Sequence, residues 1–148
     1  MVDKLLSVEN LKTYFPTDEG VVKAVDGVTF SVEPGKTLGI VGESGCGKST
    51  VGRSLLQILD HPGKIVDGEV HFESESAGGL VDLAQEKPGS SLMRQIRGGE
   101  IALVFQEPMT SFSPVHTVGN QVVEAIQLHM DVSKKVAMAR AEELFDLV

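Results

Sequence analysis

Nine consecutive residues combine three glycines, a lysine and several hydroxyl side chains in a fixed order. The run is Gly42-Glu43-Ser44-Gly45-Cys46-Gly47-Lys48-Ser49-Thr50, and it fits G-x-x-x-x-G-K-[ST] at every fixed position. Glycines let a backbone curl until its N–H groups converge on phosphate oxygens. In such a loop Lys48 places its ammonium on the β- and γ-phosphates, and the Ser49 hydroxyl binds Mg²⁺. The run therefore predicts a P-loop that binds a nucleoside triphosphate, with the whole run in contact with it.

The neighbouring residues must form a strand before the loop and a helix after it. The short apolar run at 37–41 predicts a buried strand. Val51, Leu55 and Ile58 recur at helical spacing, and the turn residues at 60–63 end that helix. The alternative is a glycine-rich turn that contains a lysine by chance. The order strand, loop, helix favours the phosphate site.

Composition limits the other classes of function. The chain has 148 residues, 41% of them hydrophobic and 23% charged, which is typical of one soluble domain. Its net charge of −8 argues against nucleic acid as a partner. A single cysteine excludes an internal disulfide, and the four scattered histidines lack metal-ligand spacing. We find no signal peptide and no apolar run near the roughly 20 residues of a membrane span.

The pattern along the chain divides it into four regions. Residues 1–36 are predicted to form antiparallel β structure, with strands at 5–11 and 28–32 joined through a turn at 16–20, and residues 37–60 form the P-loop unit.

Residues 61–106 contain two further predicted strands, at 68–72 and 101–105, on either side of a weakly structured surface insertion at 73–92. Helical spacing from Val118, and again after a Ser133 cap, makes 107–148 a helical region.

A second motif narrows the class of P-loop protein. The segment Val104-Phe105-Gln106-Glu107-Pro108-Met109-Thr110-Ser111-Phe112-Ser113-Pro114 resembles the Q-loop of ABC-transporter ATPases. The resemblance implies that Gln106 reaches Mg²⁺ and the attacking water, and a carboxamide offers acceptor and donors without adding charge there. The alternative is a strand-ending glutamine that pairs with the backbone.

The resemblance also implies an aromatic shelf for adenine. Phe15 aligns best with the aromatic residue that stacks on the base in this family, and Tyr14 is second. A flat ring stacks on adenine without a hydrogen-bond code. The alternative is a strand aromatic buried in the core.

Longer strings are similar to the ATP-binding subunits of oligopeptide and dipeptide importers. They are 22–28, 38–45, 63–70 and 105–111, followed by Pro114-Val115, although Ser113 stands where that family is expected to have asparagine.

The resemblance implies an α/β P-loop NTPase core with an N-terminal antiparallel β subdomain and the start of a helical subdomain. It implies an ATPase at the cytoplasmic face of the membrane that uses ATP and Mg²⁺, with Lys48 and Gln106 in catalytic roles. Its partners would be permease subunits, a second ATPase subunit and, indirectly, a substrate-binding protein. Nickel importers share these strings, so cargo stays open.

Other elements of the family's site do not occur in this sequence. There is no LSGGQ-type signature, no later strand ending in Asp-Glu and no switch histidine after it. We therefore expect the chain to be the N-terminal part of a longer protein, and to be inactive and marginally stable alone because apolar strand edges would lack partners. The competing functions are a soluble small-molecule kinase and a non-catalytic nucleotide-binding fragment.

Overall fold

A computed structural model of the chain describes residues 4–105 and 112–148. The chain divides into two compact units, Met1–Leu103 and Val104–Val148. Within the described residues, the first unit contains four strands and two helices, and the second contains two helices. In chain order they are β1 (Leu6–Thr17), β2 (Gly20–Val32), α1 (Lys48–Leu55), β3 (Lys64–Ser74), β4 (Gly79–Asp82), α2 (Ser91–Gly99), α3 (Val118–His129) and α4 (Lys134–Asp146).

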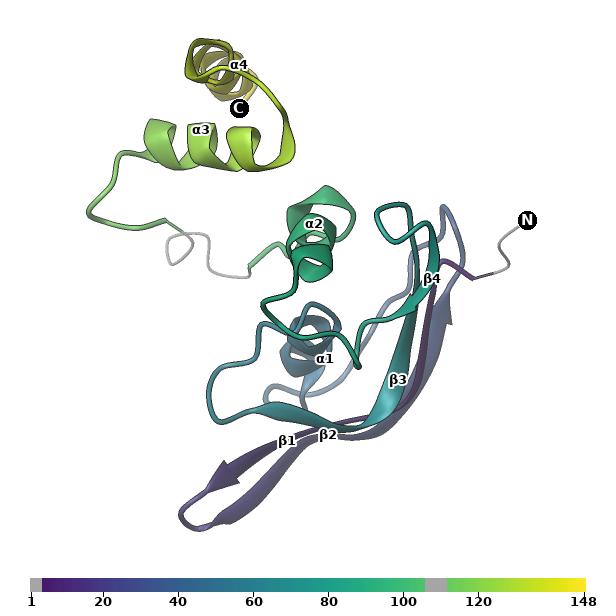
Figure 1. Cartoon of the computed structure of the whole chain (residues 1–148). Helices are drawn as coiled ribbons and strands as arrows, with labels where there is room; N and C mark the ends of the chain where they lie inside the picture. The colour runs from purple at the N-terminus through teal and green to yellow at the C-terminus, as the bar shows by residue number, and fades with distance from the viewer. Residues whose placement is uncertain (1–3, 106–111) are drawn as a thin grey trace. The chain divides into compact units, whose positions relative to one another are not determined.

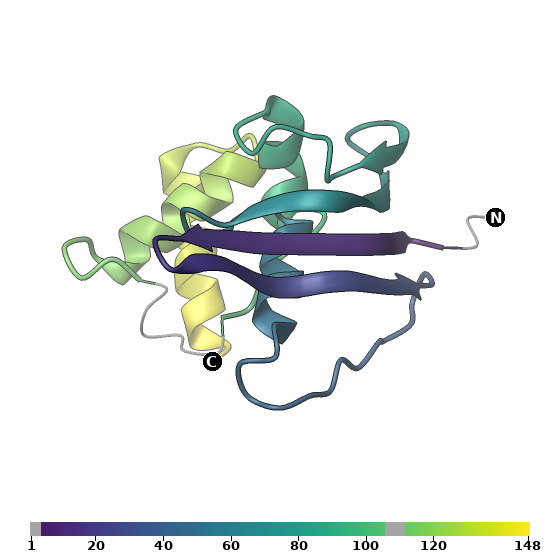
Figure 2. The same cartoon turned by 90° about the horizontal axis from the view of Figure 1, so that it is seen from below.

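The four strands form one antiparallel sheet in the order β2-β1-β3-β4. Figure 1 shows this sheet curving around α1, and Figure 2 shows β2, β1 and β3 side by side with α1 behind them. Alternate strand residues such as Leu11 and Val70 are fully buried, and they share one core with Met93 and Ile96 of α2. The sheet therefore has an inner face under the helices and an outer face in solvent.

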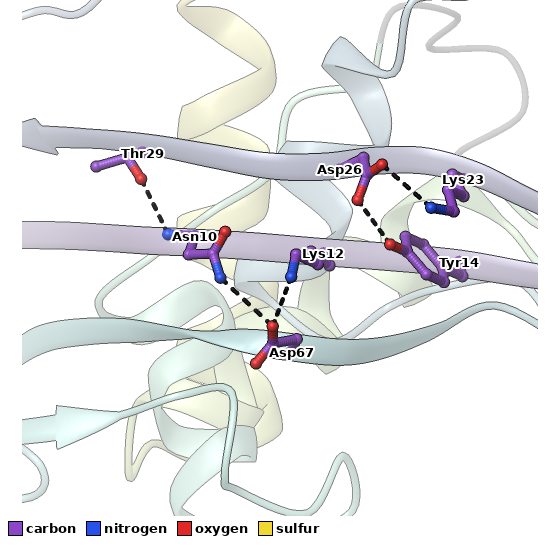
Figure 3. Close-up of polar contacts among 7 residues, drawn as sticks. All are labelled: Asn10, Lys12, Tyr14, Lys23, Asp26, Thr29 and Asp67. Carbon is purple, nitrogen blue, oxygen red and sulfur yellow. Dashed lines mark hydrogen bonds and ion pairs between the residues drawn. The ribbon is translucent and has the colours of Figure 1, made fainter.

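Bulges produce the bend of the sheet. The pairing register of β1 with β2 and β3 shifts several times, and Asn10, Gly27 and Gly68 have φ of 50°, 86° and 96°. Polar side chains bridge the strands at these positions on the outer face (Figure 3). The Asn10 N–H donates to Thr29 Oγ1 at 2.9 Å, and Asn10 Nδ2 donates to Asp67 at 3.4 Å. The backbone N–H of Asn10 at the bulge is thus satisfied by the Thr29 side chain.

The two strands predicted at 37–41 and 101–105 are absent from the described structure. Residues 37–41 form neither helix nor strand, and Val41 is 97% exposed. In the second segment only Ile101 forms an isolated bridge, with Arg97, while Leu103 lies against Gly52 of α1. A strand needs a neighbour to accept its backbone hydrogen bonds, and the described ranges supply none for these segments.

The prediction of a weakly structured insertion at 73–92 was wrong. This stretch contains the end of β3, all of β4 and the start of α2, and Leu83 is fully buried. The Ser, Gly and Glu residues on which that prediction was based include the turn at 75–78, but the four-residue strand after it is too short to give a clear alternating pattern. Helix α2 was not predicted, although Ser90 caps it by accepting from the Met93 N–H.

One carboxylate connects the β3–β4 turn to the end of α2. Glu100 accepts hydrogen bonds from Ser74 Oγ at 3.1 Å, from the Glu75 N–H at 3.0 Å and from the Ser76 N–H at 3.1 Å. Burial alone would raise the pKa of Glu100, but the hydrogen bonds from Ser76, Ser74 and Glu75 outweigh it and lower the pKa below 4.5. The ionised form is therefore the stabilising one.

Replacing Glu100 with glutamine should lower the free energy of unfolding by about 1–2 kcal/mol at pH 7, because an amide cannot accept all three bonds. A group with a lowered folded pKa stabilises the protein above its unfolded value and stops doing so as pH falls through the folded value. The difference between the parent chain and Glu100→Gln in urea unfolding should hence shrink below about pH 4.5. Glu19→Gln, in the exposed β1–β2 turn, is the control and should change nothing. A difference independent of pH would contradict this role.

The second unit is a helix pair as predicted. Ser133 caps α4 by accepting from the Val136 N–H, and Thr117 caps α3 in the same way from Asn120. Val123 packs with Ala137 and Ala141 between the two helices. None of the helices in the described part of the chain has the length and apolar character needed to span a bilayer.

Candidate nucleotide-binding site

The glycine-rich run forms a loop that ends at the first residue of α1. Gly45 and Gly47 have φ of 78° and 94°, a region that residues with a Cβ rarely occupy. A Cβ at Gly47 would also lie 2.2 Å from the carbonyl oxygen of Ala24 in β2. Glycine is therefore required at 47 for two independent reasons, conformation and close approach.

The Lys48 side chain folds back into this loop. Its Nζ donates to the carbonyl oxygens of Gly42 at 2.8 Å and Glu43 at 2.6 Å, and Cys46 Sγ lies 3.6 Å away. Lys48 is partly exposed, and its ammonium binds the loop backbone. This arrangement holds one positive charge where the loop curls, ready to bind an anion.

The N-terminus of α1 is suited to the same anion. Gly47 precedes the helix without a side-chain cap, and no acidic residue lies in its first turn. The first helical N–H groups and the positive end of the helix dipole therefore meet no competing carboxylate there. Together with the φ values of the glycines and the position of Lys48, this fits a phosphate group.

Buried contacts connect α1 to the inner face of the sheet. Thr13 of β1 and Ser54 of α1 are almost fully buried and their hydroxyls lie 2.8 Å apart.

A hollow of about 450 Å³ lies beside the loop and is lined mainly by β2 residues, the segment 38–41, Cys46, Lys48 and Val51. A larger hollow of about 550 Å³ lies near Asn10, but its lining includes Glu9, Asp67 and Glu69 and no basic residue, so it does not suit a phosphate.

The two aromatic candidates lie in different surroundings. Tyr14 donates to Asp26 Oδ1 at 2.6 Å, and Lys23 lies 5.3 Å from the centre of the Tyr14 ring (Figure 3). The hydrogen bond to Asp26 raises the pKa of Tyr14. Phe15 instead packs against Gly63, where an added Cβ would lie 2.4 Å from Phe15 Cε1. Tyr14 is thus committed to contacts on the outer face of the sheet, and Phe15 is the better candidate for a base.

The structure brings together part of the predicted site. Gly42 to Thr50 form one continuous loop and helix start, with Ser49 exposed in the first turn of α1. Gln106 lies outside the described residues. Within the described ranges, no group of three or more His, Cys, Asp or Glu side chains is arranged to hold a metal ion. Two contacts were missed from sequence, the Ala24 carbonyl at Gly47 and the Arg97 guanidinium at the end of α1, and no motif signals either one.

Comparison with known proteins identifies the family. Residues 25–147 match the family described as ABC transporter. The probable peptide ABC transporter ATP-binding protein y4tR of Sinorhizobium fredii is 47% identical over 147 residues, which are 99% of this chain and 42% of that protein. The glutathione import ATP-binding protein GsiA of Escherichia coli K12 is 39% identical over 144 residues, 97% of this chain and 23% of that protein. The chain thus spans less than half the length of these curated relatives.

A solved structure has the same fold. The ATP-binding cassette MJ0796, in a dimeric post-hydrolysis state bound to ADP and Pi, matches 93% of this chain and 54% of its own chain, with a TM-score of 0.74 at 22% identity. The fold is therefore that of an ABC ATPase. The chain belongs to the ABC transporter family, and it resembles the ATP-binding proteins of that family's peptide importers.

Proposed function

We propose that this chain carries the phosphate-binding part of an MgATP site in the ATP-binding subunit of an importer for oligopeptides or dipeptides. The observation that supports this most strongly is the Lys48 ammonium, which binds the carbonyls of a loop in which Gly45 and Gly47 adopt positive φ at the N-terminus of α1. This combination serves a triphosphate and has no evident structural purpose.

Each residue of the site has a distinct part. The backbone of 42–47 and the first turn of α1 would hold the phosphates, and Lys48 would move its hydrogen bonds from the loop carbonyls to phosphate oxygens. The Ser49 hydroxyl and Gln106 would hold Mg²⁺. When bound, Mg²⁺ supplies positive charge that offsets the charge on the β- and γ-phosphate oxygens. Phe15 would stack on adenine.

The larger assembly follows from the resemblance to peptide importers. The subunit would lie at the cytoplasmic face of the membrane, pair with a second ATPase subunit and contact permease subunits through the region around Gln106. The proposed regions remain 1–36, 37–60, 61–106 and 107–148. The chain alone, without signature and Asp-Glu strand, should bind MgATP weakly and hydrolyse it hardly at all.

Cargo is the least constrained part of the proposal, and nickel is the main alternative to peptides. ATP-dependent uptake by vesicles that contain the whole transporter, measured for labelled dipeptides, glutathione and Ni²⁺ in turn, separates these cases. Peptide uptake that Lys48→Ala abolishes would support the proposal, whereas uptake of Ni²⁺ alone would overturn the cargo. ATP hydrolysis by the 148-residue chain alone would contradict its proposed inactivity.

Alkylation of Cys46 offers a direct test of the nucleotide site. Cys46 is the only cysteine, it is exposed, and its Sγ lies 2.6 Å from the position of a Cβ added at Gly42. A maleimide adduct would therefore fill the loop, and we expect it to block ATP binding. Bound MgATP should in turn slow modification, followed by mass spectrometry.

The matched control is Cys46→Ser, which should bind ATP with nearly unchanged affinity and resist the reagent. If the alkylated chain binds ATP normally, the triphosphate does not occupy this loop. If ATP fails to protect the thiol in a chain that binds ATP, the conclusion is the same.

A further inference from the structure

A side chain of another helix binds the backbone just beyond the C-terminal end of α1. Arg97, in the last turn of α2, donates from Nε to the Leu56 carbonyl at 2.7 Å and from Nη2 to the Gln57 carbonyl at 3.1 Å. Its Nη1 donates to the Pro88 carbonyl at 2.8 Å. Carbonyls at the end of a helix lack intrahelical donors, and a cation there also faces the negative end of the helix dipole. One guanidinium thus binds the two carbonyls that follow the last residue of α1 and connects them to α2, beside the Gln57 side chain, which donates to the Leu83 and Glu86 carbonyls.

The backbone around Arg97 is shaped for this reach. Helix α2 is kinked at Arg97, where ψ is 113°, and at Gly98, where φ is 81°. The Gly98 N–H then donates to the Ile101 carbonyl at 2.8 Å. Met93 and Ile96, on the same helix, are fully buried in the core of the first unit. Arg97 therefore extends from a firmly packed base rather than from a loop.

Arg97 has no carboxylate partner in the described ranges, so its charge is directed at carbonyl oxygens alone. Burial lowers the pKa of Arg97. The partly exposed Arg97 side chain thus joins two segments through backbone carbonyls and not through an ionised partner. Its geometry, with three carbonyls from two segments, suits the planar fork of arginine and not the single ammonium of lysine.

Helix α1 is short enough for its two ends to be mechanically connected. Its eight residues span about 12 Å, with Lys48 at one end and Leu55 just before the Arg97 contacts at the other. At the N-terminal end of α1, Gly47 lies close to the Ala24 carbonyl of β2. Near the C-terminal end, the Ser54 hydroxyl of α1 is hydrogen-bonded to the Thr13 hydroxyl of β1. With Arg97 removed, the last turn of α1 could fray and the helix could pivot about Ser54, which would shift Lys48.

We propose that Arg97 is a positioning residue of the phosphate site, acting through α1 on Lys48 and the loop 42–47. This inference rests on the proposed function, because it needs that loop to bind a triphosphate. Arg97 itself does not touch the nucleotide. It fixes the far end of the helix whose first residue does.

The test compares variants by their affinity for MgATP and for inorganic tripolyphosphate, measured by calorimetry on the full chain. Arg97→Gln should weaken both ligands about tenfold, because a misplacement of about 1 Å can cost about a hundredfold and the shift expected here is smaller. Equal loss for both ligands is expected, since the phosphates are the shared part. Arg97→Lys should give an intermediate loss, because an ammonium can reach one or two of the three carbonyls.

Two controls separate positioning from general destabilisation. Arg94→Gln, on the same helix, removes only a contact to the Gly89 carbonyl and should leave affinity unchanged. Glu100→Gln weakens the same C-terminal end of α2, where Glu100 binds the β3–β4 turn and not α1, and it serves as a stability match in thermal melts. The affinities of the two variants are compared at temperatures that lie equally far below their own melting temperatures. The proposal requires that Arg97→Gln then loses more affinity for the two ligands than Glu100→Gln does.

The outcomes distinguish this inference from the proposed function. If Lys48→Ala abolishes binding but both Arg97 variants bind like the parent chain, the positioning role is overturned and the nucleotide site stands. If the parent chain binds neither ligand, both are overturned. Should Arg97→Gln fail to fold, the ratio of affinities between Arg97→Lys and Arg94→Lys decides, and a ratio of one contradicts the proposal.

Discussion

Replacing Lys48 with alanine should weaken MgATP binding by at least about tenfold, the largest effect expected of any side-chain truncation in this chain. The Lys48 ammonium already lies among loop carbonyls, 2.6 Å from the Glu43 oxygen and 2.8 Å from the Gly42 oxygen. A charge-assisted hydrogen bond to a phosphate contributes roughly 1.5–3 kcal/mol, which corresponds to a tenfold to hundredfold change in affinity.

Fluorescence titration with a labelled ATP analogue, competed with unlabelled ATP, measures this change. Lys87→Ala is the matched control, because Lys87 is exposed and far along the chain from the loop, between β4 and α2. It removes the same formal charge, so a loss in Lys48→Ala alone excludes a general effect of net charge. Equal affinity in Lys48→Ala and the parent chain would refute the P-loop assignment.

Lys48→Ala should remain folded, so a loss of ATP affinity in this variant can be attributed to the nucleotide site. Among the described residues, the side-chain hydrogen bonds of Lys48 all lie within its own loop, and the core of the first unit is formed by Leu11, Val70, Ile96 and their neighbours on other elements. Thermal melts of Lys48→Ala should therefore match those of the parent chain within the usual range for surface changes, about 0.5 kcal/mol.

Sequence reasoning predicted the parts of this molecule that depend on local contacts. The P-loop motif is encoded by consecutive residues, and Ser133 caps α4 as predicted because a cap depends on three residues of backbone. The hairpin of β1 and β2 was predicted with strands that were too short. Its bulges at Asn10 and Gly27 interrupt the alternation on which strand boundaries were based.

Strands that depend on distant partners were predicted less well. The segments 37–41 and 101–105 have the apolar composition of buried strands, but composition cannot supply the neighbouring backbone that a ladder requires. In the described structure Val41 and Val104 are 97% and 92% exposed. This is compatible with the marginal stability expected of the chain alone, which stays a prediction until a melt and a sedimentation measurement test it.

The site shows the same division between local and distant information. The pattern specified glycine at 47 for its conformation, but the close approach of the Ala24 carbonyl depends on the bulge in β2 and was not predictable. Phe15 and Tyr14 are adjacent in sequence and could be ranked only by alignment. Their separate contacts, with Gly63 and with Asp26, appear once the strands are paired.

Replacing Gly47 with alanine should disrupt the nucleotide site more severely than any other glycine substitution in the loop. The new Cβ would lie 2.2 Å from the Ala24 oxygen and 3.3 Å from its carbon, and both are backbone atoms that cannot rotate away. The φ of 94° adds strain of roughly 1–2 kcal/mol for a residue with a Cβ. Relief requires the loop to separate from β2, which moves the N–H groups of the first turn of α1.

Two alanine substitutions in the same region calibrate that result. Gly45 has φ of 78° but nothing within 4 Å of an added Cβ, so Gly45→Ala carries the strain without the clash. Gly39 has neither a positive φ nor a neighbour within that distance, so Gly39→Ala should be nearly neutral. ATP affinity should therefore fall in the order Gly39→Ala, Gly45→Ala, Gly47→Ala, with the last at least about tenfold below the second. If Gly45→Ala and Gly47→Ala lose equal affinity, backbone strain alone governs the loop. The contact with Ala24 would then play no part in binding, and the sheet would not support the phosphate site through β2.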